Sequence, residues 1–210
     1  MTLRRLRLLT AGESHGPGLS GILEGLPADL RVSTAKVDKE LARRQHGYGS
    51  GRRMQIERDR VQWTAGLRFG RTLGSPLAFS IPNRDWDNWS ERMAVEPTST
   101  SRQPKPITLA RPGHADLAGA IKYDTGDIRN VLERASARST APRVAAGAVC
   151  RQLLEACGVR LWSFVDQLGP VQAFGGVDEP AAHVPEGWVA ADRAEPTPLR
   201  CPDPEAEAAM

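Results

Sequence analysis

Alternating apolar and polar positions, interrupted by glycine and proline, predict that the chain begins with short strands. Residues 6–10 and 19–26 predict two strands joined by a glycine-rich run, and residues 76–81 predict another. Residues 54–56 and 61–63 flank a charged turn and predict a hairpin. Most of the predicted strands therefore lie in the first part of the chain.

Apolar residues at helical spacing predict two longer helices and a short one. Ser33 is a suitable N-cap for a helix over residues 34–44, because its hydroxyl can accept a hydrogen bond from the first turn. Residues 143–156 carry the strongest helical pattern and are followed by Gly158 at the C′ position. A short helical stretch is expected over residues 117–123.

The remaining segments are less regular. Residues 83–112 predict a long loop, which in a compact domain is usually functional. Residues 159–165 predict a strand, and residues 170–203 an extended connection. Asp203 is a good N-cap for a helix that has room for one turn, which is marginal alone because helix nucleation is costly. We expect either a reading frame cut short or a frayed acidic tail.

The order of strands and helices permits an α/β or an α+β fold. No stretch approaches the roughly 20 apolar residues of a membrane span, and the start shows no secretory signal. The three cysteines are odd in number and lack metal-ligand spacing, which favours reduced thiols in the cytoplasm and no metal site.

The charge is unevenly distributed along the chain. Residues 175–210 carry eight acids and two bases, a net charge of −6, so residues 1–174 carry +9, because the total is +3. Arginine supplies nearly all of this positive charge, and its guanidinium favours bidentate contacts with carboxylate and phosphate. The basic part of the chain therefore favours an anionic ligand, either a nucleic acid or a small phosphorylated or carboxylated molecule.

The glycine-rich run over residues 12–18 contains Ser14 and His15. Glycines permit close approach of backbone to a ligand, and a histidine there can act as an acid or base near neutral pH. The run lacks the Gly-Lys-Ser/Thr of a phosphate-binding loop and the spacing of a dinucleotide fingerprint. The alternative is a tight turn between two strands with a surface histidine.

Three further runs carry candidate chemistry. Residues 111–116 combine His114 with Asp116, which could orient the ring or cap a helix. Residues 133–143 interleave arginines with small hydroxyl residues before the strongest helix, which favours an anion site, although a solvated basic surface is also possible. Residues 43–53 form an arginine- and glycine-rich loop that could bind phosphate or be a solvated face.

Together these runs resemble chorismate synthases: GESHG near the start, ARR followed by GYG, RPGHAD after the long loop, then ERASARST followed by RVAAG. The resemblance extends from residue 8 to residue 210. It implies an α+β fold of the chorismate-synthase type, a β-α-β sandwich with a helical core between antiparallel sheets, in which residues 1–210 form the amino-terminal part of one domain. It also implies a carbon–oxygen lyase of the shikimate pathway of aromatic amino-acid biosynthesis, which eliminates phosphate from 5-enolpyruvylshikimate 3-phosphate to give chorismate.

The resemblance implies reduced FMN as cofactor, NADPH as a possible reductant, a cytoplasmic homotetramer at full length, and no nucleic acid or membrane as partner. It also implies roles for particular residues. These are catalysis by His15, as the acid that assists phosphate departure, and by His114, beside the flavin; cofactor binding by Arg134, Ala135, Ser136 and Arg44; and substrate binding by Ser14, Arg44 and Arg138.

The sequence departs from the family pattern at three places. Ser50 stands where relatives often have an arginine, for which Arg52 or Arg53 is a possible substitute, and Ser139 replaces a common acidic residue. The later Arg-Ser-Asp signature is absent. We therefore expect the 210-residue chain alone to bind FMN weakly and to turn over poorly. A basic nucleic-acid-binding module and a non-catalytic remnant that pairs with a separate carboxy-terminal piece are the competing hypotheses.

Overall fold

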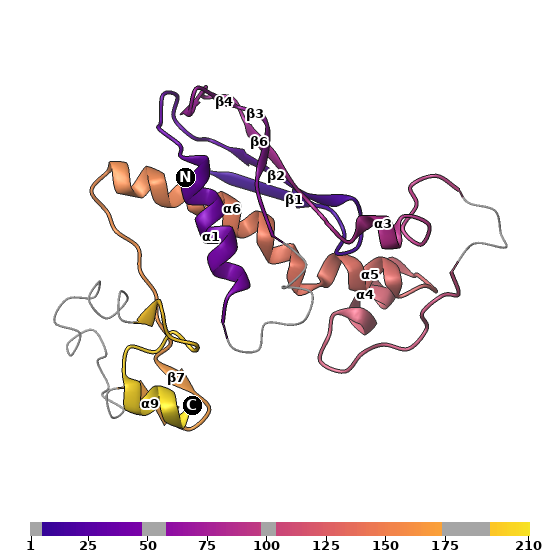
Figure 1. Ribbon diagram of the computed structural model, residues 1–210. Helices are drawn as coiled ribbons and strands as arrows, with labels where there is room; N and C mark the ends of the chain where they lie inside the picture. The colour runs from indigo at the N-terminus through magenta and orange to yellow at the C-terminus, as the bar shows by residue number, and fades with distance from the viewer. Residues whose placement is uncertain (1–5, 48–57, 98–103, 174–193) are drawn as a thin grey trace, which may run out of the picture.

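An antiparallel sheet of four strands forms one layer of the protein (Figure 1). The computed structural model describes residues 6–47, 58–97, 104–173 and 194–210. The sheet has the order β1-β2-β6-β3. Its strands are β1 (Arg7–Ala11), β2 (Gly18–Glu24), β6 (Leu77–Pro82) and β3 (Gln62–Ala65). The predicted strands at 6–10, 19–26 and 76–81 are therefore confirmed.

Alternation along the strands separates a buried face of the sheet from an exposed one. In β2, Leu19 and Leu23 are buried, and in β6, Phe79 and Ile81 are buried. Gly21 lies opposite Phe79 in the register, and a Cβ there would come within 2.3 Å of the phenyl ring. The glycine is therefore required for the ring to lie across the middle of the sheet.

Helices α1 (Thr34–Gln45) and α6 (Thr140–Ala156) pack on each other, and α6 also packs on the sheet (Figure 1). The Ser33 hydroxyl caps α1 as predicted, by accepting from the Lys36 N–H. Helix α6 begins three residues before the predicted start, because Pro142 lies in its first turn, where the missing N–H would have no helical partner. Gly158 follows α6 with a φ of +77°, as expected for a C′ glycine.

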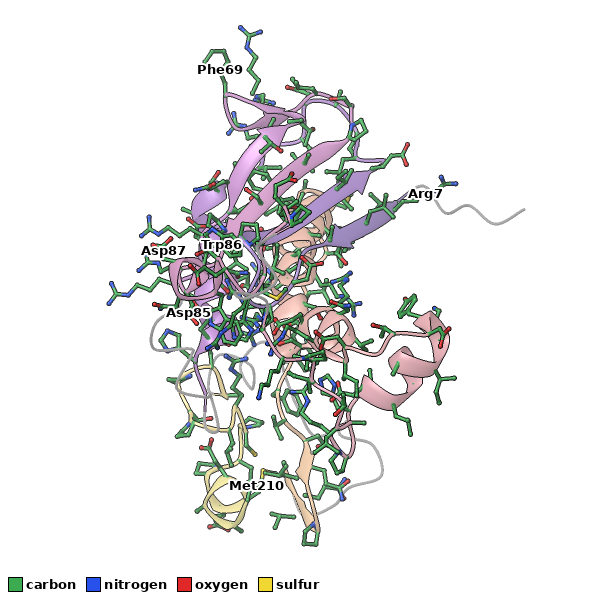
Figure 2. The ribbon with its side chains drawn as sticks, turned by 90° about the vertical axis from the view of Figure 1, so that its right-hand side faces the viewer. Arg7, Phe69, Asp85, Trp86, Asp87 and Met210 are labelled. Carbon is green, nitrogen blue, oxygen red and sulfur yellow. The ribbon has the colours of Figure 1, made fainter. Side chains whose placement is uncertain are left out.

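The short helices gather where α6 begins, at one end of the sheet (Figure 1). They are α3 (Trp86–Trp89), α4 (Asp116–Tyr123), α5 (Arg129–Ala135) and the 3-10 turn η2 (Ala137–Ser139). Figure 2 shows α3, marked by Asp85, Trp86 and Asp87, between the exposed Phe69 and the C-terminal Met210. The predicted helix at 117–123 is confirmed as α4, whereas α3 and α5 were not predicted.

Two small hairpins and a last helix complete the described elements. They are β4 (Leu67–Arg68) with β5 (Arg71–Thr72), β7 (Gln167–Leu168) with β8 (Val171–Gln172), and α9 (Pro204–Ala209). The helix predicted after Asp203 is confirmed, because the Asp203 side chain accepts from the N–H groups of Glu205 and Ala206. Ala206 then packs in a small cluster with Ala173 and Cys201.

One predicted strand is absent, and one predicted hairpin lies partly outside the described residues. Residues 159–165 form no strand, and the next pairing begins at β7. Residues 62–65 form β3, which pairs with β6. The first strand of the predicted hairpin, at residues 54–56, lies outside the described residues. Asp59, expected in a charged turn, is buried.

The α+β class is confirmed by a sheet whose strands all pair antiparallel and whose buried face is covered by α1 and α6. Among the described residues, no helix is long and apolar enough to cross a membrane. The end of the sheet from which β2 starts and at which β6 ends lies beside the beginning of α6, and the candidate residues meet there.

Candidate active site at the beginning of helix α6

The glycine-rich turn between β1 and β2 is fastened to the end of α5 by Glu133. The Ser14 N–H donates to the backbone carbonyl of Glu133 at 2.9 Å, and the His15 N–H donates to its carboxylate at 2.9 Å. The ring Nδ1 of His15 lies 2.8 and 3.0 Å from the two carboxylate oxygens. Since the Glu133 side chain is 1% exposed and that of His15 is 23% exposed, a buried carboxylate holds a histidine that remains partly accessible.

An aromatic side chain from the long loop covers one face of the same histidine. The rings of His15 and Trp89 stack with centroids 3.9 Å apart and planes inclined by 25°. The indole Nε1 of Trp89 donates to the Asp85 carboxylate at 2.9 Å, which fixes the indole in turn. Arg92 and Arg129 also lie over the Trp89 ring, at 5.4 and 5.9 Å from its centroid. Trp89 therefore packs on the candidate acid.

Asn83 joins the turn to Arg138. Its side-chain amide donates to the carbonyls of Glu13 and Gly16 at 3.1 and 2.7 Å, and its side-chain oxygen accepts from Arg138 Nε at 2.9 Å. The Asn83 backbone N–H donates to the Pro17 carbonyl at 3.1 Å. A single buried amide therefore determines the path of the glycine-rich turn. No motif marks Asn83 in the sequence beyond its place in the long loop.

Arg138 and Arg44 converge on the buried carboxylate of Asp59. Arg138 Nη1 lies 2.6 Å from one oxygen of Asp59, and Arg44 Nη1 lies 3.3 Å from the other. The side chains are 4% exposed for Arg138, 9% for Arg44 and 0% for Asp59. Arg44 also donates to the Thr140 hydroxyl at 2.8 Å, in the first turn of α6. Both arginines expected to bind substrate thus have structural partners, and Arg138 lies below the surface.

The predicted cofactor-binding residues lie between α5 and α6. Arg134 donates to the carbonyl and the hydroxyl of Thr10 at 2.9 and 2.8 Å, which joins α5 to the end of β1. The Ser136 hydroxyl accepts from the Arg138 N–H at 3.3 Å and caps η2. Ala135 is exposed and Ser136 is half-buried. Ser50, Arg52 and Arg53 lie outside the described residues.

His114 belongs to a second charged group, at the start of α4. Its Nδ1 forms a short contact with Asp116, whose carboxylate also accepts from Arg111 Nε at 2.9 Å and from the Arg111 backbone N–H at 3.0 Å. Asp116 is the first residue of α4, while Ala115 is at the cap position and makes no side-chain hydrogen bond. Asp116 therefore orients His114 and Arg111, and the alternative that it caps the helix was wrong.

Hydrogen bonding from Arg111 holds the pKa of Asp116 well below its ordinary value of 3.8, against the opposing effect of burial. The same bond raises the pKa of Arg111, and the charge of Glu133 adds to that increase. Glu133 is therefore electrostatically coupled to both groups, since it holds His15 directly and acts on Arg111 through its charge. The group around His114 lies at the start of α4, and the group around His15 is fastened to α5 through Glu133. Helices α4 and α5 pack on each other, and the side chain of Val131 fills the space beside Gly119.

Because the pKa of Asp116 is lowered in the folded chain, we expect the free energy of unfolding to depend on pH. Because the folded carboxyl binds its proton less readily than the unfolded one, its stabilisation is present above about pH 4 and is lost as the pH falls toward the folded pKa. The stability difference between the unmodified chain and Asp116→Asn should therefore narrow between pH 6 and pH 3. Urea unfolding at several pH values measures it. Asp124→Asn, at the exposed end of α4, is the control, and a difference that is constant with pH would contradict the prediction.

A cavity of about 870 Å³ lies elsewhere, between α1, the end of α6 and residues 158–163. Three of its basic side chains are already paired with carboxylates: Lys36 with Glu155 at 2.7 Å, Arg43 with Glu195 at 2.7 Å and Arg151 with Glu40 at 2.9 Å. We therefore place the candidate active site at the beginning of α6, because of the histidine and arginine side chains that meet there, and not in this cavity. The described residues contain no group of three or more histidine, cysteine or acidic side chains placed to hold a metal ion.

Of the predicted site residues, Ser14, His15, Arg44 and Arg138 are joined by one network, with Arg134 and Ser136 beside it. Sequence reasoning missed four residues that organise this network: Asp59, Asn83, Trp89 and Glu133. Glu133 lies within one of the runs selected from the sequence, but its partner is 118 positions away.

Comparison with known proteins agrees with the resemblance found in the sequence. Residues 6–210 match the family model described as chorismate synthase. The chain is 54% identical over 209 residues to "Chorismate synthase" of Symbiobacterium thermophilum, covering 98% of this chain and 52% of that protein. For "Chorismate synthase" of Aquifex aeolicus the identity is 52% over 206 residues, with the same coverage. The structure titled "Crystal Structure of Chorismate Synthase" superposes with a TM-score of 0.76 at 42% identity, over 99% of this chain and 52% of that chain.

The chain thus spans about half the length of the relatives that it matches. Its match to the family model covers nearly every residue, and the solved structure has the same fold over the same region. This chain belongs to the chorismate synthase family.

Proposed function

We propose that this chain takes part in the chorismate synthase reaction, the anti-1,4-elimination of phosphate from 5-enolpyruvylshikimate 3-phosphate. The observation that carries the proposal is His15, a partly exposed histidine held by a buried carboxylate in a glycine-rich turn. A leaving phosphate benefits from a positioned proton donor. Membership of the family supports a lyase of the shikimate pathway.

The charge around His15 suits such a substrate, which carries a phosphate and two carboxylates. Arg92 and Arg129 lie on the ring that stacks on His15, and Arg111 lies half-exposed beside His114. Guanidinium groups bind these anions and stabilise charge that develops on a departing oxygen. Since Arg138 is buried against Asp59 and Asn83, we propose that it supports the site from below and that exposed arginines contact the substrate.

The residues present also suit an anionic cofactor such as FMN. The Nε of Arg129 is buried without a hydrogen-bond partner among the described residues, and the exposed Ala135 and the Ser136 hydroxyl follow it along the chain. These residues, with Arg134, would hold the phosphate or the ring edge of the flavin. Reduced flavin, when bound, supplies electron density that assists the loss of phosphate.

His114 is the proposed partner of that flavin. Because the Asp116 carboxylate can only accept, His114 Nδ1 carries a hydrogen, and Arg111 Nη2 lies 3.1 Å from each ring nitrogen. Asp116 and Arg111 therefore orient the ring, and a proton exchanged beside the cofactor would pass through Nε2. The proposal also includes NADPH as the reductant, with Arg44 in contact with it. It further includes a cytoplasmic location, a homotetramer at full length, and a single domain of which residues 1–210 are part.

An anaerobic assay tests the proposed function. The chain is mixed with photoreduced FMN and 5-enolpyruvylshikimate 3-phosphate, and released phosphate is measured over time. We expect substrate binding by calorimetry, weak FMN binding, and slow phosphate release that stops when FMN is oxidised. The absence of both substrate binding and phosphate release would contradict the proposal. Full turnover with tight FMN binding would contradict the expectation that the chain alone is a poor catalyst.

The competing hypotheses make different predictions. A nucleic-acid-binding module would bind single or double strands with an affinity that falls steeply with salt, and filter binding measures this. A non-catalytic piece that assembles with a carboxy-terminal partner would become active only on co-expression with it. The buried pairing of Arg44 and Arg138 disfavours the first alternative, because phosphate-backbone binding uses exposed cations.

A further inference from the structure

Glu133 contacts the His15 segment through its backbone carbonyl and both carboxylate oxygens. The carbonyl accepts from the Ser14 N–H, Oε2 accepts from the His15 N–H, and both oxygens lie within 3.0 Å of the ring Nδ1. One residue thus determines both the backbone position and the ring orientation of His15.

The burial of Glu133 favours one orientation of the His15 ring over the others. Its side chain is 1% exposed, and a carboxylate removed from water must be matched by hydrogen-bond donors. The His15 N–H and Nδ1 are the donors that it has in this structure. Rotation of the imidazole away from Glu133 would leave the carboxylate without its main partner, so the ring is held in this orientation by the cost of breaking the pair.

The chemistry of the pair determines which ring atom can exchange a proton. An ionised carboxylate only accepts hydrogen bonds, so Nδ1 of His15 carries a hydrogen in both the neutral and the charged ring. A proton passed to a ligand must therefore leave from Nε2. Trp89, stacked at 3.9 Å, covers one face of the ring and limits tilting about the Nδ1 contact.

From these contacts we infer that Glu133 is a positioning residue, which fixes the tautomer and the direction of His15 so that Nε2 faces the departing phosphate. The inference rests on the proposed function for the identity of the ligand. The tautomer and orientation of the ring follow from the described contacts alone. Glu133 itself need not touch the substrate, because it acts through the imidazole.

The first test reads the ring directly and needs no activity. Long-range proton–nitrogen NMR correlations in the nitrogen-15-labelled chain report which nitrogen of each of its four histidines is protonated, and His15→Asn identifies the signal of His15. We expect a hydrogen on Nδ1 in the unmodified chain, and a changed or averaged pattern in Glu133→Gln. A His15 ring that carries its hydrogen only on Nε2 in the unmodified chain would overturn the inference, whether or not Glu133→Gln folds.

The second test uses kinetics of phosphate release. Glu133→Gln preserves volume, and we expect kcat to fall about 10- to 100-fold with KM changed less than about threefold. In a His15→Asn background, the same substitution should cause no further decrease, because its effect passes through the imidazole. Glu155→Gln, at the far end of α6, should leave kcat unchanged.

The outcomes separate this inference from the proposed function. An equal decrease in both backgrounds would show a general structural effect and overturn the positioning role. If the unmodified chain neither bound the substrate nor released phosphate, the proposed function would fail, and the NMR result would still decide whether Glu133 fixes the ring.

Discussion

Replacing Asp59 by asparagine should lower the free energy of unfolding by about 3–5 kcal/mol, the range for breaking a buried ion pair by removal of one partner. Asparagine preserves the size of the side chain but removes its charge. The guanidinium of Arg138, 2.6 Å away and 4% exposed, would then lose the negative charge of its buried partner Asp59. Because whole domains are stable by only about 5–15 kcal/mol, this is a large share.

Urea unfolding followed by tryptophan fluorescence measures the effect. Asp29→Asn is the matched control, since Asp29 pairs with Arg71 at 2.8 Å but its side chain is 79% exposed. An exposed pair of this kind is worth at most about 1 kcal/mol. The double variant Asp59→Asn with Arg138→Met should cost less than the sum of the single variants, because both buried charges are removed together. Equal losses in Asp59→Asn and Asp29→Asn would contradict the prediction.

The part of the fold that the sequence predicted is the part set by local pattern. Helix α1 is specified by the Ser33 cap and a buried stripe that includes Val37 and Leu41, and α6 by its run of small and apolar residues. Strands β2 and β6 are predictable because their residues alternate between the buried and exposed faces. Each of these signals lies within one element and does not depend on a distant partner.

The wrong predictions concern segments that depend on distant partners. Residues 159–165 have strand-like composition, but no described strand pairs with them, and composition alone does not supply a ladder of hydrogen bonds. The pairing of residues 62–65 with β6 was not predicted, because no local turn signal indicates a partner across that interval. Asp59 looked solvated because it stands among other charges, whereas its burial depends on Arg138, 79 positions later.

The candidate site was predicted as a set of runs, but not as a network. His15, His114 and the arginines were selected from motifs, each of which is local. Asn83 and Trp89 lie in a segment without a pattern, and they become significant only when β6 brings that segment beside the glycine-rich turn. The long loop was expected to be functional. Its first residues include Asn83, which holds the glycine-rich turn, and Trp89, which covers His15.

Replacing His15 by asparagine should produce the largest loss of activity, a decrease in kcat for phosphate release of about 10²- to 10⁴-fold, as expected for removal of a general acid. Asparagine is close in size to part of the imidazole and can still donate to Glu133. The turn keeps its backbone bonds from Ser14 to Glu133 and from Asn83 to Pro17. Substrate affinity should therefore change only a few-fold, because the arginines that attract the anion are unaltered.

The kcat and KM of phosphate release under anaerobic conditions with reduced FMN, measured for His15→Asn and the unmodified chain, separate the two effects. His46→Asn is the control, since His46 is exposed just after α1 and has no contact with the Glu133 group among the described residues. A decrease in kcat of less than about threefold for His15→Asn, in a chain that still releases phosphate, would mean that another group supplies the proton. A large rise in KM at unchanged kcat would instead assign His15 to substrate binding, because uniform binding affects KM and a proton donor affects kcat.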